Sequence, residues 1–183
     1  MIKIKVAMKG IYSLDNLKTK SINKKNGENG IYLWGVKNGS RYISLYVGKD
    51  RNIHERIFQH LCRWRGGEYR VPAWDDIINL KTNSPSFVRN SKLLYIPHGP
   101  LVYKDFLSNT DIQYSIQKVL DNFFCCWEIL SDGLNAYDEE DALATLIIKE
   151  NLISSHRKND TPETPFTKQF YKEFKEATKK PSP

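Results

Sequence analysis

Two runs rich in β-branched and aromatic residues lie early in the chain, over residues 31–37 and 41–47. Asn38-Gly39 lies between them, and this dipeptide between strand-like runs is a strong local signal for a β-hairpin. Upstream, residues 1–8 alternate charged and apolar side chains, which predicts a strand, and residues 13–20 predict a short basic helix. We therefore expect a hairpin preceded by a strand and a helix.

After the hairpin, Asn52 followed three residues later by Glu55 has the form of a helix-capping box. The helix it starts should continue to about Trp64, because two glycines follow directly afterwards. Residues 65–106 are interrupted by prolines and glycines, so they predict irregular structure with one short helix over 74–80. This stretch has the character of an insertion.

The second half of the chain alternates helical and strand-like patterns. The expected elements are a helix capped at Asn109 or Thr110 and reaching about 122, a buried strand over 123–130, a helix over 138–154, and a last helix after Pro165. In the last helix Phe166, Phe170 and Phe174 recur at every fourth position. Such a stripe predicts a helix face packed on the core.

This order of elements predicts an α/β layered domain of α+β character, in which helices flank a small central sheet. We expect three strands in the sheet, mostly antiparallel. The chain divides into a basic N-terminal extension (1–28), a core (29–159) carrying an inserted segment at about 63–106, and a C-terminal helix (160–183). We expect all three to form one globular unit.

Composition adds a preference for a polyanionic partner. The 183 residues include 28 Lys and Arg against 21 Asp and Glu, a net charge of +7, and neutralising phosphates releases their counterions. No apolar run is long enough to span a bilayer, so we expect no membrane partner. Three cysteines without paired spacing predict neither a disulfide framework nor a zinc site, which favours an intracellular, cytoplasmic location.

The polar residues of the hairpin and the following helix are the candidate chemistry. Tyr32 and Tyr46 would lie on adjacent strands, and Gly48 permits a tight exit into the helix. On that helix Arg56 and His60 are four residues apart and share a face. Singly, each has a plainer explanation as a packing or surface residue. Together they match phosphodiester cleavage, which needs an activator for water, a cation for phosphate charge and a metal ion.

These residues resemble the motifs of the GIY-YIG endonucleases. The chain has Gly30-Ile31-Tyr32, Tyr46-Val47-Gly48 and the Arg-x-x-x-His motif ending at His60, with Val47 in place of the family's Ile and a slightly longer hairpin connection. The resemblance covers roughly residues 29–159. It implies the GIY-YIG fold with a large insertion, and a DNA endonuclease that uses one Mg²⁺ or Mn²⁺ per active site.

The resemblance also implies roles. Tyr32 would act on the attacking water as general base, and Tyr46 would hold the scissile phosphate or share that role. Arg56 would stabilise the pentacoordinate phosphate, and His60 would relay a proton or orient Tyr32. Lys49 would contact phosphate, with a plain surface lysine as the alternative. A phenol is a poor base at neutral pH, so Arg56, Lys49 and the metal ion would have to favour its phenolate form.

Further residues of the motifs would support the site. Gly30 and Gly48 allow close packing, and Asn159 either braces the site or belongs to a turn. The family's metal-binding Glu aligns with position 144, where this chain has Ala144. Either the Glu has been replaced deliberately, or the protein is naturally inactive and only binds DNA, or the register differs and another acid serves. The other acids are Glu140 and Glu150; we favour deliberate replacement.

The inserted segment is the candidate for DNA recognition, because the core would contact mainly backbone. Basic and aromatic residues alternate there, and the candidate DNA-binding residues are Arg63, Arg65, Arg70, Trp74, Arg89 and Lys92, with Tyr69 among the aromatics. The alternative is an insertion that buries its own aromatic residues on the core.

The compact chain most resembles a restriction enzyme, which would act on a specific sequence in double-stranded DNA. The alternatives are a homing or repair nuclease of the same family, or a non-catalytic DNA-binding module on the same fold. Because one site must act twice to cut a duplex, a homodimer is also possible.

Overall fold

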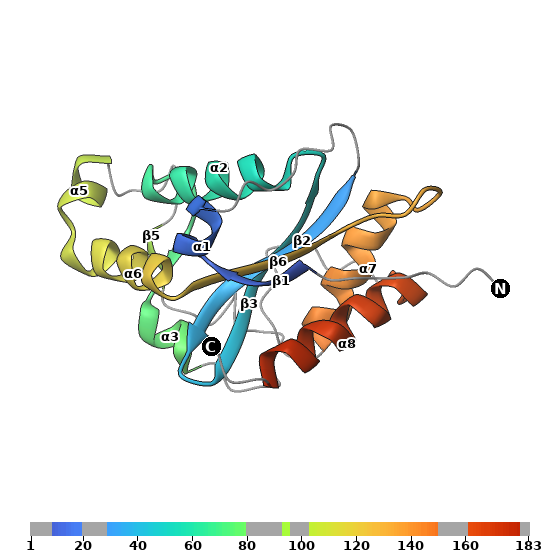
Figure 1. Ribbon diagram of the computed structural model, residues 1–183. Coiled ribbons are helices and arrows are strands. Elements are labelled where there is room, and N and C mark those ends of the chain that lie inside the picture. Colours follow the sequence, from blue (N-terminus) through green and yellow to red (C-terminus); the bar gives the residue numbers. More distant parts are fainter. Residues whose placement is uncertain (1–8, 20–28, 80–92, 96–102, 150–160, 180–183) are drawn as a thin grey trace.

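The computed structural model describes residues 9–19, 29–79, 93–95, 103–149 and 161–179 (Figure 1). The elements in chain order are β1 (Lys9–Ser13), α1 (Leu14–Thr19), β2 (Gly30–Asn38), β3 (Arg41–Asp50), α2 (Ile53–Arg65), β4 (Val71–Pro72), α3 (Trp74–Ile78), β5 (Leu93–Tyr95), α5 (Tyr103–Ser108), α6 (Thr110–Asp121), β6 (Phe123–Ile129), α7 (Ala136–Lys149) and α8 (Pro165–Lys179). No described helix is long and apolar enough to span a bilayer.

The central sheet is antiparallel and has four strands in the order β1-β6-β2-β3. The prediction of three strands was therefore wrong by one edge strand. That strand, β1, pairs with β6 and comes from the N-terminal extension, where the ring of Tyr12 stacks on Trp127 with centroids 4.7 Å apart. The strand expected over residues 1–8 lies outside the described residues. The short helix expected next is confirmed as α1.

The predicted hairpin is confirmed as β2 and β3, with its turn shifted by one residue. Asn38 pairs with Arg41, so Gly39 and Ser40 form the connection. Gly39 has a φ of 60°, the left-handed region that glycine adopts without strain. Further along, Tyr32 lies opposite Gly48, after an irregularity in the register next to Trp34. The hairpin thus brings both motifs side by side.

Two apolar clusters lie on opposite faces of the sheet, because successive strand residues alternate between faces. The α2-side cluster contains Tyr32 and Trp34 from β2 together with side chains of α2, α3 and α6. The α7-side cluster contains Ile31 and Leu33 together with side chains of α7 and α8. Figure 1 shows α2 and α6 on one side of the sheet and α7 and α8 on the other. Helices therefore flank the sheet, as expected for an α/β layered domain.

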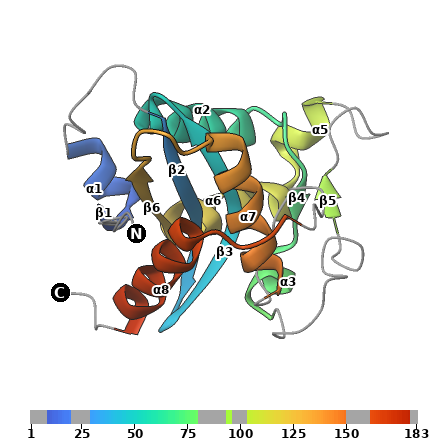
Figure 2. The ribbon, with the colours of Figure 1, turned by 90° about the vertical axis from the view of Figure 1, so that its right-hand side faces the viewer.

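The predicted helices are confirmed within a few residues. Asn52 caps α2 by accepting a hydrogen bond from the Glu55 amide at 3.4 Å, and Asn109 caps α6 by accepting one from the Ile112 amide at 3.0 Å. Helix α7 begins at Ala136, two residues earlier than expected. In α8 the three phenylalanines of the stripe are all buried in the α7-side cluster. Figure 2 shows α8 running across that face.

The inserted segment is more ordered than predicted where the structure describes it. Strands β4 and β5 pair, and α3 and α5 add helical turns around them. The segment packs on the core through Trp74 and Ile77 of α3, which belong to the α2-side cluster. Ser115 of α6 fixes the strand pair by donating a hydrogen bond to the Pro72 carbonyl at 2.7 Å. These long-range contacts leave no periodic signal in the sequence.

Candidate active site

Strands β2 and β3 hold the two tyrosines next to each other, with ring centroids of Tyr32 and Tyr46 6.0 Å apart. Gly48 lies directly opposite Tyr32 in the register. A Cβ at Gly48 would overlap the ring and hydroxyl of Tyr32 and lie 2.6 Å from the Tyr46 ring. Glycine is therefore required at this position so that the Tyr32 ring can lie across the neighbouring strand.

Gly30, at the start of β2, has a similar role towards the next helix. A Cβ there would collide with the terminal methyl of Ile53 in α2 and lie 3.0 Å from the Glu128 carbonyl oxygen of β6. The glycine lets α2 pack closely on the sheet. Close packing sets the height of the Arg56 and His60 side chains above the hairpin, and thus their distance from the tyrosines.

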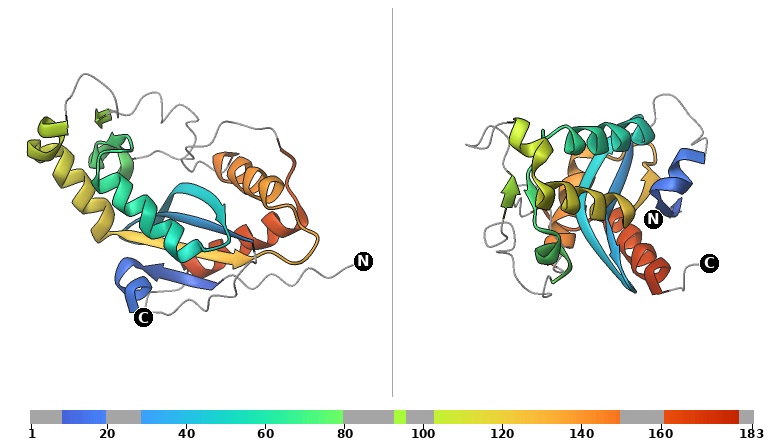
Figure 3. Two further views of the ribbon diagram at one scale, coloured as in Figure 1. Left: turned by 90° about the horizontal axis from the view of Figure 1, so that it is seen from above. Right: turned by 90° about the vertical axis from the view of Figure 1, so that its left-hand side faces the viewer.

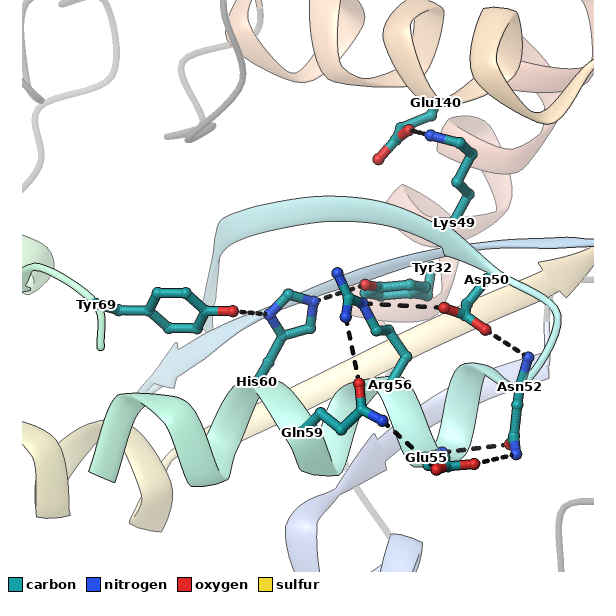
Figure 4. Close-up of polar contacts among 10 residues, drawn as sticks. All are labelled: Tyr32, Lys49, Asp50, Asn52, Glu55, Arg56, Gln59, His60, Tyr69 and Glu140. Atoms are coloured by element: carbon teal, nitrogen blue, oxygen red, sulfur yellow. Dashed lines mark hydrogen bonds and ion pairs between the residues drawn. The ribbon is translucent and has the colours of Figure 1, made fainter. Parts of the chain in front are cut away.

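Helix α2 places His60 between two phenols (Figure 4). Its Nε2 lies 2.9 Å from the Tyr32 hydroxyl, and its Nδ1 lies 2.9 Å from the Tyr69 hydroxyl. The ring is 5% exposed, and its centroid lies 4.8 Å from that of Tyr46. Both ring nitrogens are thus engaged, and one of them contacts the residue expected to act on water.

Burial sets the protonation states in this group. Burial, with Arg56 and Arg63 nearby, lowers the pKa of His60 from 6.5 to about 4, so the imidazole is neutral at pH 7. Burial and then Tyr46 raise the pKa of Tyr32, although the charge of Arg56 opposes the shift. Burial and then Glu140 raise the pKa of Tyr46. The desolvation of both phenols thus exceeds the effect of the cations nearby, and the phenolate form would need further positive charge, such as the expected metal ion.

Arg56 lies beside Tyr32 and is held by polar neighbours of its own loop and helix (Figure 4). Its guanidinium donates to the Gln59 side-chain oxygen at 3.2 Å and lies 3.9 Å from a carboxylate oxygen of Asp50. Asp50 also accepts a hydrogen bond from the Asn52 amide at 2.8 Å, which ties the end of β3 to the start of α2. Arg56 is half-buried, so its charge faces the tyrosines with reduced screening.

Lys49 and Glu140 form an ion pair at the edge of the hairpin. The side chain of Lys49 extends from β3 towards α7, which carries Glu140. Its ammonium also lies 3.7 Å from the ring centroid of Tyr137. Figure 3 shows α7 lying alongside the hairpin. Glu140 is 7% exposed and lies close enough to raise the pKa of Tyr46. The ion pair lies on the α7 side of the hairpin, and its carboxylate acts on Tyr46 electrostatically.

Position 144 is not at this site. Ala144 is 2% exposed and belongs to the α7-side cluster with Leu143 and Phe170, on the face of the sheet opposite to Tyr32. The position at which a metal ligand was expected therefore lies in the apolar core, whereas Glu140, one helical turn earlier, pairs with Lys49. Glu150 and Asn159 lie outside the described residues.

One side chain of this group, the carboxylate of Glu140, suits a hard divalent cation. Mg²⁺ is usually held by one or two carboxylates, with water and substrate phosphate completing its shell, and Glu140 supplies one carboxylate. Within the described ranges no three His, Cys, Asp or Glu side chains gather into a group able to hold a metal ion. A complete protein cage is thus not formed by these residues, whereas a one-carboxylate site that shares its ion with substrate is compatible with them.

The expected DNA-binding residues do not all lie on the surface. Arg63, Arg65 and Arg70 are exposed near the end of α2 and in the loop after it, and Arg63 pairs with Glu68 at 3.5 Å. Trp74 is only 8% exposed within the α2-side cluster. The expectation that Trp74 contacts DNA was wrong, because its indole packs the insertion on the core. Arg89 and Lys92 lie outside the described residues.

Three residues of this site could not be placed there from the motifs alone. Asp50 carried a signal, because an acid two residues before a helix cap often bonds the backbone there. Tyr137 is 69% exposed on α7, one turn before Glu140, and would have followed from placing Glu140 at the site. Tyr69 lies in the loop after α2, and no local pattern could have placed its hydroxyl at His60.

The chain matches no protein-family model, no curated protein and no solved structure.

Proposed function

We propose that this chain is a metal-dependent endonuclease that hydrolyses phosphodiester bonds in double-stranded DNA, of the GIY-YIG type that its motifs resemble. The observation that carries the proposal is the 2.9 Å contact between the Tyr32 hydroxyl and Nε2 of a neutral His60. Arg56 and Glu140 lie around the same two tyrosines. An excess of basic residues across the chain suits a polyanionic substrate.

The first chemical step would be proton transfer from water. Tyr32 is protonated at rest, so it accepts the proton of the attacking water only as it passes its own proton to Nε2 of His60. Because its pKa is about 4, the imidazole carries no proton on Nε2 at pH 7 in the tautomer that faces Tyr32, so this nitrogen is open to accept one. Tyr32 thereby acts as a relay, and His60 takes the final proton, which corresponds to general base catalysis.

Negative charge on the phosphate would be stabilised by two cations. Arg56 lies beside Tyr32 and can turn from Asp50, 3.9 Å away, towards a phosphate oxygen. Lys49 lies on the α7 side of the hairpin and can leave Glu140 for substrate. Fixed donors of this kind act where charge develops in the transition state.

A metal ion would be held by Glu140, which replaces position 144 in this proposal. When bound, Mg²⁺ or Mn²⁺ supplies a Lewis acid for the leaving oxygen of the phosphodiester. Lys49 would have to release the Glu140 carboxylate at the same time. Tyr137 offers the ammonium a second contact, since its ring lies 3.7 Å away.

Among endonucleases of this type, we propose a sequence-specific, restriction-type enzyme. It is supported by the exposed arginines Arg63, Arg65 and Arg70 near the end of α2 and in the loop after it. Arginine is the side chain that most often reads guanine in the major groove. A homing or repair nuclease remains the alternative within the family, and a homodimer would let two such sites cut both strands.

A plasmid assay tests the activity. The purified chain should convert supercoiled DNA to the open-circular or linear form in Mg²⁺ and not in EDTA, and Tyr32→Phe should lose at least about a hundredfold in rate, the typical contribution of acid–base catalysis. Binding of a short duplex with no cleavage in Mg²⁺ or Mn²⁺ would instead favour the non-catalytic DNA-binding module. Cleavage at one short palindrome would favour restriction over repair.

A further inference from the structure

Tyr69 is the one partner of the candidate site that comes from the loop after α2, outside the motifs. The helix ends at Gly66, Gly67 has a φ of 74°, and the Glu68 amide donates to the Arg63 carbonyl at 2.9 Å. This tight reversal returns the chain over the last turn of α2. Tyr69 is therefore placed above His60, with its hydroxyl 2.9 Å from Nδ1.

The roles of the two phenols that contact His60 depend on which ring nitrogen carries the hydrogen. A neutral imidazole has one N–H donor and one acceptor nitrogen, and His60 is neutral at pH 7 because its pKa is about 4. Of the two phenols that contact it, one must donate to the ring and the other must accept from it. The choice decides whether Nε2 can receive a proton from Tyr32.

Burial favours one arrangement. Tyr32 is 0% exposed, so its hydroxyl proton needs an acceptor within the protein, and leaving it unpaired would be unfavourable. The nearest strong acceptor is Nε2 of His60, a more basic atom than the oxygen of Tyr46. Tyr69 is only half-buried, so water can accept its hydroxyl proton. Its hydroxyl oxygen lies 2.9 Å from Nδ1 and can accept the N–H there while its own proton goes to water.

We propose that Tyr69 is a positioning residue that holds His60 in the Nδ1–H form. Its oxygen accepts the Nδ1–H, which leaves the Nε2 lone pair directed at the Tyr32 hydroxyl. When the proton of Tyr32 moves to Nε2, the Nδ1–H bond to Tyr69 remains and stabilises the imidazolium. In the same step Tyr32 takes the proton of the attacking water, so the phenol is neutral before and after the transfer. The catalytic part of this inference rests on the proposed function; the tautomer does not.

Nitrogen NMR of the full chain tests the tautomer directly. With ¹⁵N-labelled histidine, the His60 resonances, assigned by their loss in His60→Gln, should show a protonated Nδ1 and an unprotonated Nε2 at pH 7. Tyr69→Phe removes the acceptor, so we expect a mixture of both tautomers. Tyr114→Phe is the control, because Tyr114 lies 55% exposed on α6 and should leave the spectrum unchanged. An Nε2–H form in the unaltered chain, or no change in Tyr69→Phe, overturns the inference.

Single-turnover kinetics test the catalytic part. Tyr69→Phe should lower kcat about tenfold with little change in KM, since only the fraction of His60 in the productive tautomer reacts. An unchanged kcat in this variant, with the tautomer shifted, overturns the catalytic role of Tyr69. If the unaltered chain never nicks DNA, the proposed function fails while the tautomer measurement still decides the structural part.

Discussion

His60 carries a pH-dependent contribution to stability as well as a proposed proton. Its pKa is about 4 in the folded chain and near 6.5 in the unfolded chain, because burial and the adjacent arginines disfavour the charged ring. Between these values the unfolded chain binds the proton first. Stability is therefore full above pH 6.5 and falls as the pH decreases towards 4.

The first prediction follows from this linkage. The free energy of unfolding should fall by about 3 kcal/mol or less between pH 7 and pH 4 through His60 alone. Urea denaturation at several pH values measures it in the unaltered chain and in His60→Gln, which should lose this part of the pH dependence. His54→Gln is the matched control, since His54 lies on the same helix against Phe58. Equal pH dependence in the unaltered chain and His60→Gln would contradict the burial of a neutral imidazole.

The second prediction concerns Ala144, which lies among apolar side chains and not at the site. Ala144→Glu should destabilise the fold by about 3–5 kcal/mol, because it buries an unpaired carboxylate, and it should not raise nuclease activity. Urea denaturation and plasmid nicking check the two parts. Ala177→Glu, at a half-buried position of α8, should change stability far less. A stable and more active Ala144→Glu protein would return the metal ligand to position 144.

The hairpin is the element on which the site depends, and glycine at 48 makes its packing possible. Gly48→Ala should force the Tyr32 ring out of place, with loss of activity and overpacking of about 1–3 kcal/mol. Gly39→Ala is the control: its φ of 60° makes alanine strained by about 1–2 kcal/mol, but open space surrounds it. Gly39→Ala should therefore lose stability and keep its activity. Equal activity loss in both variants would mean that the effect of Gly48→Ala is general unfolding.

Elements governed by local signals could be predicted from the sequence. The hairpin follows from Asn38-Gly39 between apolar runs, and α2 and α6 follow from their asparagine caps. The paired strands β4 and β5 could not be predicted, because they are short and form through contacts between distant residues. Strand β1 likewise exists through pairing with β6. Local propensity says little about such pairs.

The candidate site was predictable to the extent that it is local. Tyr32, Tyr46, Arg56 and His60 follow from strand pairing and from helical spacing within 29 residues. Glu140 comes from a distant helix, and its rotation relative to the sheet depends on packing by residues such as Leu143. Positions 140 and 144 are one turn apart and share a helix face in the sequence. In the structure Glu140 pairs with Lys49, whereas Ala144 lies in the apolar core. Only tertiary structure separates the two.

At the scale of the whole molecule, the charge of +7 should govern binding to nucleic acid. Affinity for a random duplex should fall steeply with salt, and Arg63→Gln or Arg70→Gln should each reduce the slope of log affinity against log salt by about 1. Fluorescence anisotropy at several salt concentrations measures this. The control is Lys172→Gln, because Lys172 is an exposed residue of α8, on the other side of the sheet from α2. This variant should keep the slope. Slopes unaffected by the arginine variants would place the DNA elsewhere.

The proposed activity depends on one carboxylate of α7, and its neighbour provides a matched comparison. Glu140 pairs with Lys49 beside the tyrosines, whereas Glu139 accepts a hydrogen bond from Thr164 at 2.5 Å, between α7 and α8. Both side chains are buried, and both can be replaced by Gln without a change of shape.

Mg²⁺-dependent nicking of supercoiled plasmid by the unaltered chain, Glu140→Gln and Glu139→Gln is therefore the most direct measurement. The unaltered chain and Glu139→Gln should nick at similar rates, and Glu140→Gln should be slower by a factor of at least about 100, a loss of roughly 3 kcal/mol of transition-state stabilisation. No nicking by the unaltered chain in Mg²⁺ or Mn²⁺, or equal rates for Glu140→Gln and the unaltered chain, would contradict a metal-dependent nuclease built around Glu140.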